Sequence, residues 1–97
     1  MTPAFEWDST KAAENFKKHR VTFDEAVTVL ADPLASIFDD PDHSSEERRE
    51  LIIGHSASLR VMVVSFTERK DRTRIISARL ATHLERRAYE EHTKANS

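Results

Sequence analysis

The chain has 97 residues, of which 38% are hydrophobic and 33% are charged, and its formal net charge is −2. This length and composition indicate one polar globular domain over residues 1–97 and exclude a disordered or membrane-spanning chain, since the longest apolar run is only Val61 to Val64. The sequence has no cysteine, which excludes disulfides and thiol nucleophiles and, with an N-terminus unlike a signal peptide, favours the cytoplasm.

Two helices are predicted near the N-terminus. The first has Asp8 as its N-cap and runs to about His19. The second follows almost at once, because Thr22 and Glu25 have the spacing of a capping box, in which each side chain bonds the other residue's backbone N–H. Asp32-Pro33 ends this helix, since proline disfavours helical geometry in the residue before it.

The second half of the chain predicts a sheet and a closing helix. Strands are expected over residues 34–38, 51–55, 59–67 and 72–78. The third of these has apolar side chains on both faces, which is typical of a central strand. The helix begins at Thr82, which forms another capping box with Glu85, and residues 93–97 are expected to be a disordered tail. The predicted fold is α+β, with two N-terminal helices, a four-stranded, mainly antiparallel sheet and a C-terminal helix.

Charge is distributed unevenly along the chain. Residues 39–50 hold six acidic and two basic side chains, whereas residues 69–87 hold seven basic and two acidic ones. A localised positive surface of this kind can attract phosphate groups even when the whole chain is acidic. A solvated surface of mixed charge is the alternative.

Arg79 and Arg69 are the first candidates for catalysis. Arg79 follows the last predicted strand, and Arg69 lies in the loop that precedes it. An arginine fork grips a phosphate through two N–H groups, and fixed cations stabilise the charge that builds on the phosphate oxygens when a ribose 2′-hydroxyl attacks. RNA cleavage of this kind needs no metal. The alternative for Arg79 is a structural ion pair with Glu47 or Glu85.

Two more arginines are candidates for holding a bound strand. Arg74 lies in the last predicted strand and Arg48 precedes the strand over residues 51–55. Strict alternation along the last strand places Arg72 and Arg74 on one face and Arg79 on the other. A solvated outer face is the alternative for Arg72 and Arg74.

Four further side chains carry competing interpretations. Lys18 and His19 could supply a cation and an acid–base group near a scissile phosphate, or simply complement the dipole at the end of a helix. Glu47 could act as a base or form an ion pair within its loop. Tyr89 could stack on a nucleobase or pack against Trp7, and packing is the preferred interpretation.

The sequence predicts neither a metal nor a cofactor. Gly54 is the one glycine, so a glycine-rich phosphate-binding loop is excluded. The five histidines are scattered and include no His-x-x-x-His pair, so they lack the usual spacing of metal ligands on a helix.

Several short segments follow one another in a characteristic order. They are Phe5-Glu6-Trp7-Asp8, Lys11-Ala12 with Asn15, Lys18-His19 with Val21 and Phe23, Glu25-Ala26, Asp32-Pro33, His43-Ser44 with Glu47-Arg48, Ile53-Gly54, Arg74 to Arg79, Ala81-Thr82, Glu85-Arg86 and Tyr89-Glu90. Together they resemble the BrnT family of toxins over nearly the whole chain. One position departs from the family pattern, because Arg20 follows Lys18-His19 where the family commonly has a glycine suited to a left-handed turn.

This resemblance implies a fold and an activity. It implies a single RelE-like domain with metal-independent endoribonuclease activity, which inhibits translation. It also implies a BrnA-type antitoxin, a ribbon-helix-helix protein that neutralises the toxin in a hetero-oligomer and makes the DNA contacts. Two other functions stay open, namely a non-catalytic module that docks RNA or a partner protein and a purely structural partner of a DNA-binding protein.

Overall fold

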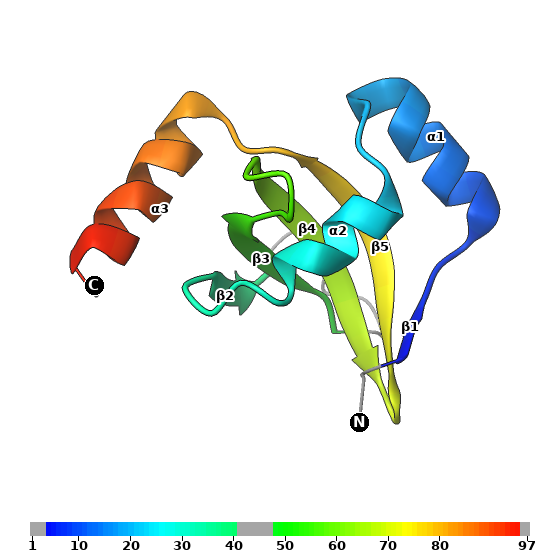
Figure 1. Cartoon of the computed structure of the whole chain (residues 1–97). Coiled ribbons are helices and arrows are strands. Elements are labelled where there is room, and N and C mark those ends of the chain that lie inside the picture. Colours follow the sequence, from blue (N-terminus) through cyan, green and yellow to red (C-terminus); the bar gives the residue numbers. More distant parts are fainter. Residues whose placement is uncertain (1–3, 41–47, 96–97) are drawn as a thin grey trace.

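The structure, a computed structural model, describes residues 4–40 and 48–95. Its elements in chain order are β1 (Ala4–Glu6), α1 (Ser9–His19), α2 (Phe23–Val29), β2 (Ser36–Asp39), β3 (Glu50–His55), β4 (Val61–Arg69), β5 (Arg72–Leu80) and α3 (His83–Ala95). In this part of the chain the strands form a five-stranded sheet in the order β1-β5-β4-β3-β2. Figure 1 shows α1 and α3 at opposite sides of the molecule, with the sheet and α2 between them.

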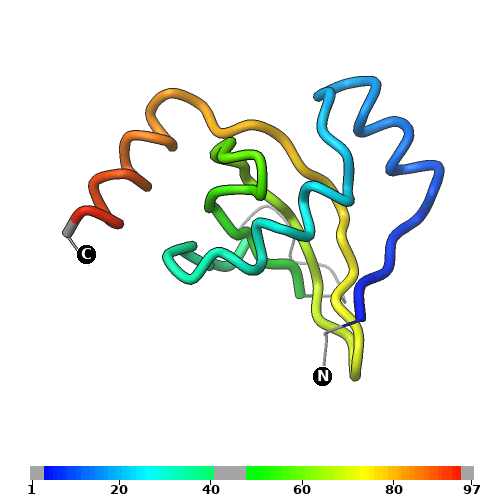
Figure 2. Tube along the Cα trace, viewed as in Figure 1, coloured from blue at the N-terminus to red at the C-terminus, as the bar shows by residue number. Residues whose placement is uncertain are grey.

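The sheet has one strand more than the sequence predicts. β1 runs parallel to β5, with Phe5 opposite Thr73, and the tube in Figure 2 shows the blue segment alongside the yellow one. The other pairings, β2 with β3, β3 with β4 and β4 with β5, are antiparallel. The α+β prediction is confirmed, but the prediction of four strands is wrong, because a three-residue strand is too short to show an alternating pattern.

β4 lies at the centre of the sheet, as its two apolar faces predict. Met62 and Val64 belong to the larger core, which lies beneath α1 and α2. Val61 and Val63 belong to a smaller core with Tyr89 of α3. We call these two surfaces the α1/α2 face and the α3 face of the sheet.

Several predicted strand boundaries are wrong: two strands begin two residues later than predicted, and β4 and β5 extend two residues further, to Arg69 and Leu80. β4 begins at Val61 because Leu59, with φ of 64°, lies in a left-handed turn that no strand continues through. β2 begins at Ser36 because the Leu34 N–H donates to Asp32 Oδ1 (2.9 Å) in a turn after the proline.

A bulge at Ile76 interrupts the pairing of β5 with β4. The register joins Val63 to Arg79, Ser65 to Ser77, Phe66 to Ile75, Thr67 to Arg74 and Arg69 to Arg72, which leaves Ile76 without a partner. One extra residue reverses the alternation of side chains beyond it. The prediction that Arg79 lies on the face opposite Arg72 and Arg74 is therefore wrong, and all three arginines share the α3 face.

α1 ends at an arginine in the left-handed conformation. Arg20 has φ of 58° and ψ of 33°, and its N–H donates to the Phe16 carbonyl (2.7 Å). Its guanidinium carbon lies 5.7 Å from the centre of the Phe16 ring, a cation–π contact. The turn has the geometry that suits glycine, so arginine costs about 1 kcal/mol there, and Lys18 and His19 keep their expected place at the end of α1.

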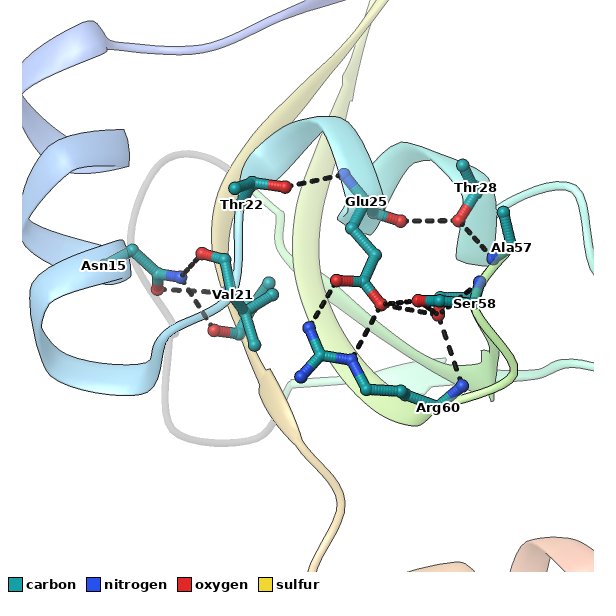
Figure 3. Close-up of polar contacts among 10 residues, drawn as sticks. Asn15, Val21, Thr22, Glu25, Thr28, Ala57, Ser58 and Arg60 are labelled. Carbon is teal, nitrogen blue, oxygen red and sulfur yellow. Dashed lines mark hydrogen bonds and ion pairs between the residues drawn. The ribbon is translucent and has the colours of Figure 1, made fainter.

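Asn15 fastens α1 to the edge of β5. Its Nδ2 donates to the carbonyls of Ala78 (2.8 Å) and Val21 (3.2 Å), and its Oδ1 accepts the Ala78 N–H (3.1 Å) (Figure 3). The amide is buried and supplies a donor and an acceptor where a neighbouring strand would otherwise supply them. Asn15 therefore satisfies the backbone hydrogen-bonding groups of Ala78, at a part of the β5 edge that the short strand β1 does not reach.

The capping box of α3 is confirmed in both directions. The Glu85 N–H donates to Thr82 Oγ1 (3.2 Å), and the Thr82 N–H donates to Glu85 Oε1 (2.8 Å). The helix continues to Ala95, past His92, so the expected tail over 93–97 begins inside it, while residues 96–97 lie outside the described part. None of the described helices is long and apolar enough to cross a membrane.

Candidate active site

The structure distributes the predicted site residues over separate surfaces. Arg79 and Arg74 lie on the α3 face with Tyr89, whereas Lys18 and His19 lie at the end of α1. Arg69 is the last residue of β4, Arg48 precedes β3, and Glu47 lies outside the described residues. Within the described ranges, no three acidic or histidine side chains gather as a metal-binding group.

Arg79 is held by one edge of its guanidinium. Nη1 and Nη2 donate to the two carboxylate oxygens of Glu85 (2.7 and 3.0 Å), and Nη1 also reaches the Leu80 carbonyl (3.3 Å). Of the two predicted alternative partners, Glu85 is the one that the structure shows. A guanidinium has five N–H groups, so Nε–H and one Nη2–H remain along its side edge for a second oxyanion. The side chain is 40% exposed, which gives a phosphate access to that edge.

The ion pair fixes both charges at neutral pH. The hydrogen bond from Arg79 is the main cause that lowers the pKa of Glu85 to about 2, and burial, the next largest cause, acts in the opposite direction. The same bond raises the pKa of Arg79. The guanidinium is thus a cation of fixed orientation, as charge stabilisation in a transition state requires.

Arg74 and Arg48 have carboxylate partners of their own. Arg74 Nη1 donates to Glu6 Oε2 (2.8 Å), which joins β5 to β1. Arg48 Nη2 donates to Asp39 Oδ1 (2.8 Å), where both side chains are exposed. Exposed pairs such as Arg48–Asp39 contribute little to stability, so Arg48 can exchange its partner for a phosphate at small cost, whereas the Arg74–Glu6 pair is partly buried.

Lys18 and His19 line a hollow on the other side of β5. Its volume is about 310 Å³, and it is also lined by Glu14 of α1 and by Ile76 and Ser77 at the bulge. Arg79 does not line this hollow. The structure therefore places the predicted cation and acid–base group in a hollow separate from the predicted phosphate-stabilising arginine.

Tyr89 is buried and packs differently from the prediction. Its ring lies against Ile53, Val61 and Val63, whereas Trp7 lies in an edge contact with Phe23, which belongs to the core of the α1/α2 face. Packing against Trp7 is therefore wrong. The ring is only 3% exposed, so α3 would have to move before it could stack on a base.

A polar cluster that the sequence analysis missed surrounds the Tyr89 hydroxyl. The hydroxyl donates to Asp32 Oδ2 (2.5 Å) and lies 3.0 Å from His55 Nδ1. Asp32 Oδ2 also accepts the backbone N–H of His55 (2.8 Å). Residues 32, 55 and 89 are far apart in the chain, so no local spacing could have predicted their meeting.

Two members of this cluster have shifted pKa values. Burial, and next the bond to Asp32, raise the pKa of Tyr89 to about 12. Burial also acts to raise the pKa of Asp32, but hydrogen bonds from Tyr89 and from backbone N–H groups outweigh it and lower that pKa. At neutral pH the tyrosine is therefore protonated and the aspartate ionised.

Glu25 anchors the turn that follows His55. Its Oε2 accepts from Ser56 Oγ (2.7 Å), Ser58 Oγ (2.5 Å) and Arg60 Nε (3.0 Å), and its Oε1 accepts from Arg60 Nη2 (Figure 3). The Thr22 half of the predicted capping box is confirmed, since the Glu25 N–H donates to Thr22 Oγ1 (3.1 Å). The reciprocal half is wrong, because these partners take the carboxylate away from the helix start.

Gly54 permits the close approach of Asp32 to β3. A Cβ at position 54 would lie 2.9 Å from Asp32 Oδ2 and 2.9 Å from Ala35 Cβ. We expect Gly54→Ala to lower the free energy of unfolding by about 1–3 kcal/mol, because the methyl group overpacks this contact. Urea denaturation measures the loss, and a change below about 0.5 kcal/mol would contradict the tight fit.

Comparisons with known proteins indicate the family of this chain. A family model described as "Ribonuclease toxin, BrnT, of type II toxin-antitoxin system" matches residues 7–85. The crystal structure of the Brucella abortus ribonuclease toxin BrnT superposes with a TM-score of 0.65 and 25% sequence identity, over 84% of this chain and 100% of that chain. A comparison with curated proteins finds no match. The chain therefore belongs to the BrnT family of ribonuclease toxins of type II toxin–antitoxin systems.

Proposed function

We propose that this chain is a RelE-like, metal-independent endoribonuclease that inhibits translation by cutting RNA at the α3 face of its sheet. The observation that carries the proposal is the open side edge of the Arg79 guanidinium, held in place by Glu85. The ion pair positions the arginine before RNA binds, so little reorganisation is needed when charge develops on the phosphate.

The reaction is attack by a ribose 2′-hydroxyl on the adjacent phosphate. A bond forms between the 2′ oxygen and phosphorus while the bond to the 5′ oxygen breaks, and the 2′ proton is lost as the 5′ oxygen gains one. The products are a 2′,3′-cyclic phosphate and a 5′-hydroxyl. Arg79 donates to the non-bridging oxygens, where negative charge increases in the transition state.

The remaining basic residues would bind the RNA on either side of the cleaved phosphate. Arg74 and Arg69 continue the α3 face along β5 and β4, and Arg48 lies beyond the start of β3. Because Lys18 and His19 line a separate hollow, their proposed role is to hold a more distant phosphate or to exchange protons there. This arrangement would bind single-stranded RNA mainly through the attraction between the basic side chains and the phosphates.

We also propose that an antitoxin controls this activity. Membership of a type II toxin–antitoxin family implies an antitoxin partner. A BrnA-type, ribbon-helix-helix antitoxin would neutralise the chain in a hetero-oligomer and would make the DNA contacts. The toxin would act in the cytoplasm, where its RNA substrate is translated.

The proposal is tested with purified protein and a 5′-labelled single-stranded RNA in EDTA, with and without ribosomes. We expect cleavage in EDTA, with 2′,3′-cyclic phosphate ends on the products. Cleavage that appears only when magnesium is restored would contradict the metal-independent mechanism. RNA that is bound but never cut would favour the alternative of a non-catalytic binding module.

A further inference from the structure

The hydrogen bonds around Tyr89 determine which nitrogen of His55 carries the proton. A tyrosine hydroxyl has one proton, and here it is donated to the Asp32 carboxylate, which can only accept. The contact between the same hydroxyl and His55 Nδ1 (3.0 Å) must then be donated by the imidazole. Neutral His55 is therefore protonated at Nδ1, and Nε2 carries the lone pair as an acceptor.

His55 lines a hollow of about 330 Å³ beside α3. The hollow is bounded by the β3–β4 turn, the end of β5 and one side of α3, and its charged lining residues are Arg60, Arg86 and Glu90. Arg60 is paired with Glu25, whereas no described carboxylate lies within ion-pair distance of Arg86, which is exposed. A guanidinium able to bind an oxyanion and an imidazole acceptor thus line the same hollow.

This pairing matches the chemistry of one ribose-phosphate unit. A phosphate accepts from arginine, and a ribose 2′-hydroxyl can donate to an imidazole lone pair. Deoxyribose lacks that donor, so an acceptor held at this position distinguishes RNA from DNA. The Glu25 cluster fixes the β3–β4 turn, the bond from the Tyr89 hydroxyl to Asp32 fixes α3, and the Asp32 contact with the His55 N–H fixes the end of β3.

We propose that this hollow is an RNA-specific subsite, in which Arg86 binds a phosphate and His55 Nε2 accepts a hydrogen bond from a ribose 2′-hydroxyl. The central strand β4 separates this subsite from Arg79. His55 of β3 pairs with Val61 on one side of β4, and Arg79 of β5 pairs with Val63 on the other side. This subsite rests on the proposed function only because it takes RNA as its ligand. It would contact a ribose of the same RNA strand whose phosphate Arg79 would hold.

The test uses two probes that cannot be cleaved as RNA, adenosine 5′-monophosphate and 2′-deoxyadenosine 5′-monophosphate. They differ only in the 2′-hydroxyl. We expect ¹⁵N NMR titrations of the full chain to show tighter binding of the ribonucleotide by roughly three- to tenfold, the value of one hydrogen bond. The shifts should include the imidazole nitrogens of His55, with Nδ1 protonated in the free protein.

Two variants separate the phosphate contact from the sugar contact. His55→Asn keeps an N–H group that can reach Tyr89 but loses the Nε2 acceptor, so ribonucleotide affinity should fall to that of the deoxyribonucleotide. Arg86→Ala should weaken both probes equally. Equal binding of the two probes by the unaltered chain, or discrimination that persists in a folded His55→Asn protein, would overturn the subsite.

The outcome is independent of RNA cleavage. A chain that prefers the ribonucleotide through His55 but never cuts RNA keeps the subsite and loses the proposed catalytic function. A chain that cuts RNA in EDTA but binds both probes equally keeps the catalytic function and loses the subsite.

Discussion

Replacing Arg79 with alanine should lower the rate of RNA cleavage by roughly 10²–10³-fold, the usual effect of removing one preorganised donor from a transition state. Growth inhibition by the expressed chain should disappear with it. Arg79→Lys should recover only part of the rate, because an ammonium keeps the charge but lacks the planar fork. The measurements are single-turnover cleavage of labelled RNA and colony formation after induction.

Glu85→Gln is the matched control for this variant. It breaks the same ion pair from the other side, keeps the cation on β5, and retains a side chain that can complete the capping box with Thr82. If Arg79 acts on the phosphate, Glu85→Gln should lose clearly less activity than Arg79→Ala, because the cation stays in place and loses only part of its fixed orientation. An equal loss in both variants would show that the ion pair serves only to hold α3.

Glu25 should make the fold sensitive to acid. The bond from Arg60 is the largest cause that lowers its pKa from 4.5 to about 2, although burial opposes the shift. A depressed carboxyl pKa adds stability above the unfolded value, and that stability is lost as pH falls through the folded value. We expect a loss of about 3 kcal/mol between pH 5 and pH 2, since each pKa unit corresponds to roughly 1.4 kcal/mol.

Glu25→Gln tests this attribution. At pH 7 it should destabilise the chain, because the charged bonds to Arg60 and to the serines of the turn are weakened. In urea denaturation series between pH 5 and pH 2, its free energy of unfolding should fall by about 3 kcal/mol less than that of the unaltered chain, while Glu85 still titrates in both. Glu91→Gln, at an exposed position of α3, is the control and should leave the pH profile unchanged.

Local sequence signals predicted most of the secondary structure. Asp8, Thr22 and Thr82 mark helix starts, because a capping side chain bonds backbone N–H groups only two or three residues away. The apolar residues on both faces of β4 predicted its central place. These signals are visible in one sequence because the interacting groups are close neighbours or follow a fixed period.

The parts that sequence reasoning missed depend on contacts between distant residues. β1 exists because β5 offers it an edge, and no feature of its three residues requires a strand. The contact of Asp32 with Tyr89 joins positions that are 57 residues apart in the chain. Arg79 was identified as a candidate, but its face could not be derived, since the bulge at Ile76 leaves no mark in the alternating pattern.

That bulge makes the position of the arginines depend on how many residues the strand contains. Replacing Ile76 by another side chain leaves the register unchanged, whereas deleting one residue there would restore strict alternation and turn Arg79 away from Arg74. The number of residues in this short stretch therefore determines which face of the sheet Arg79 occupies. A gain or loss of one residue there would divide the basic surface between the two sides of the sheet.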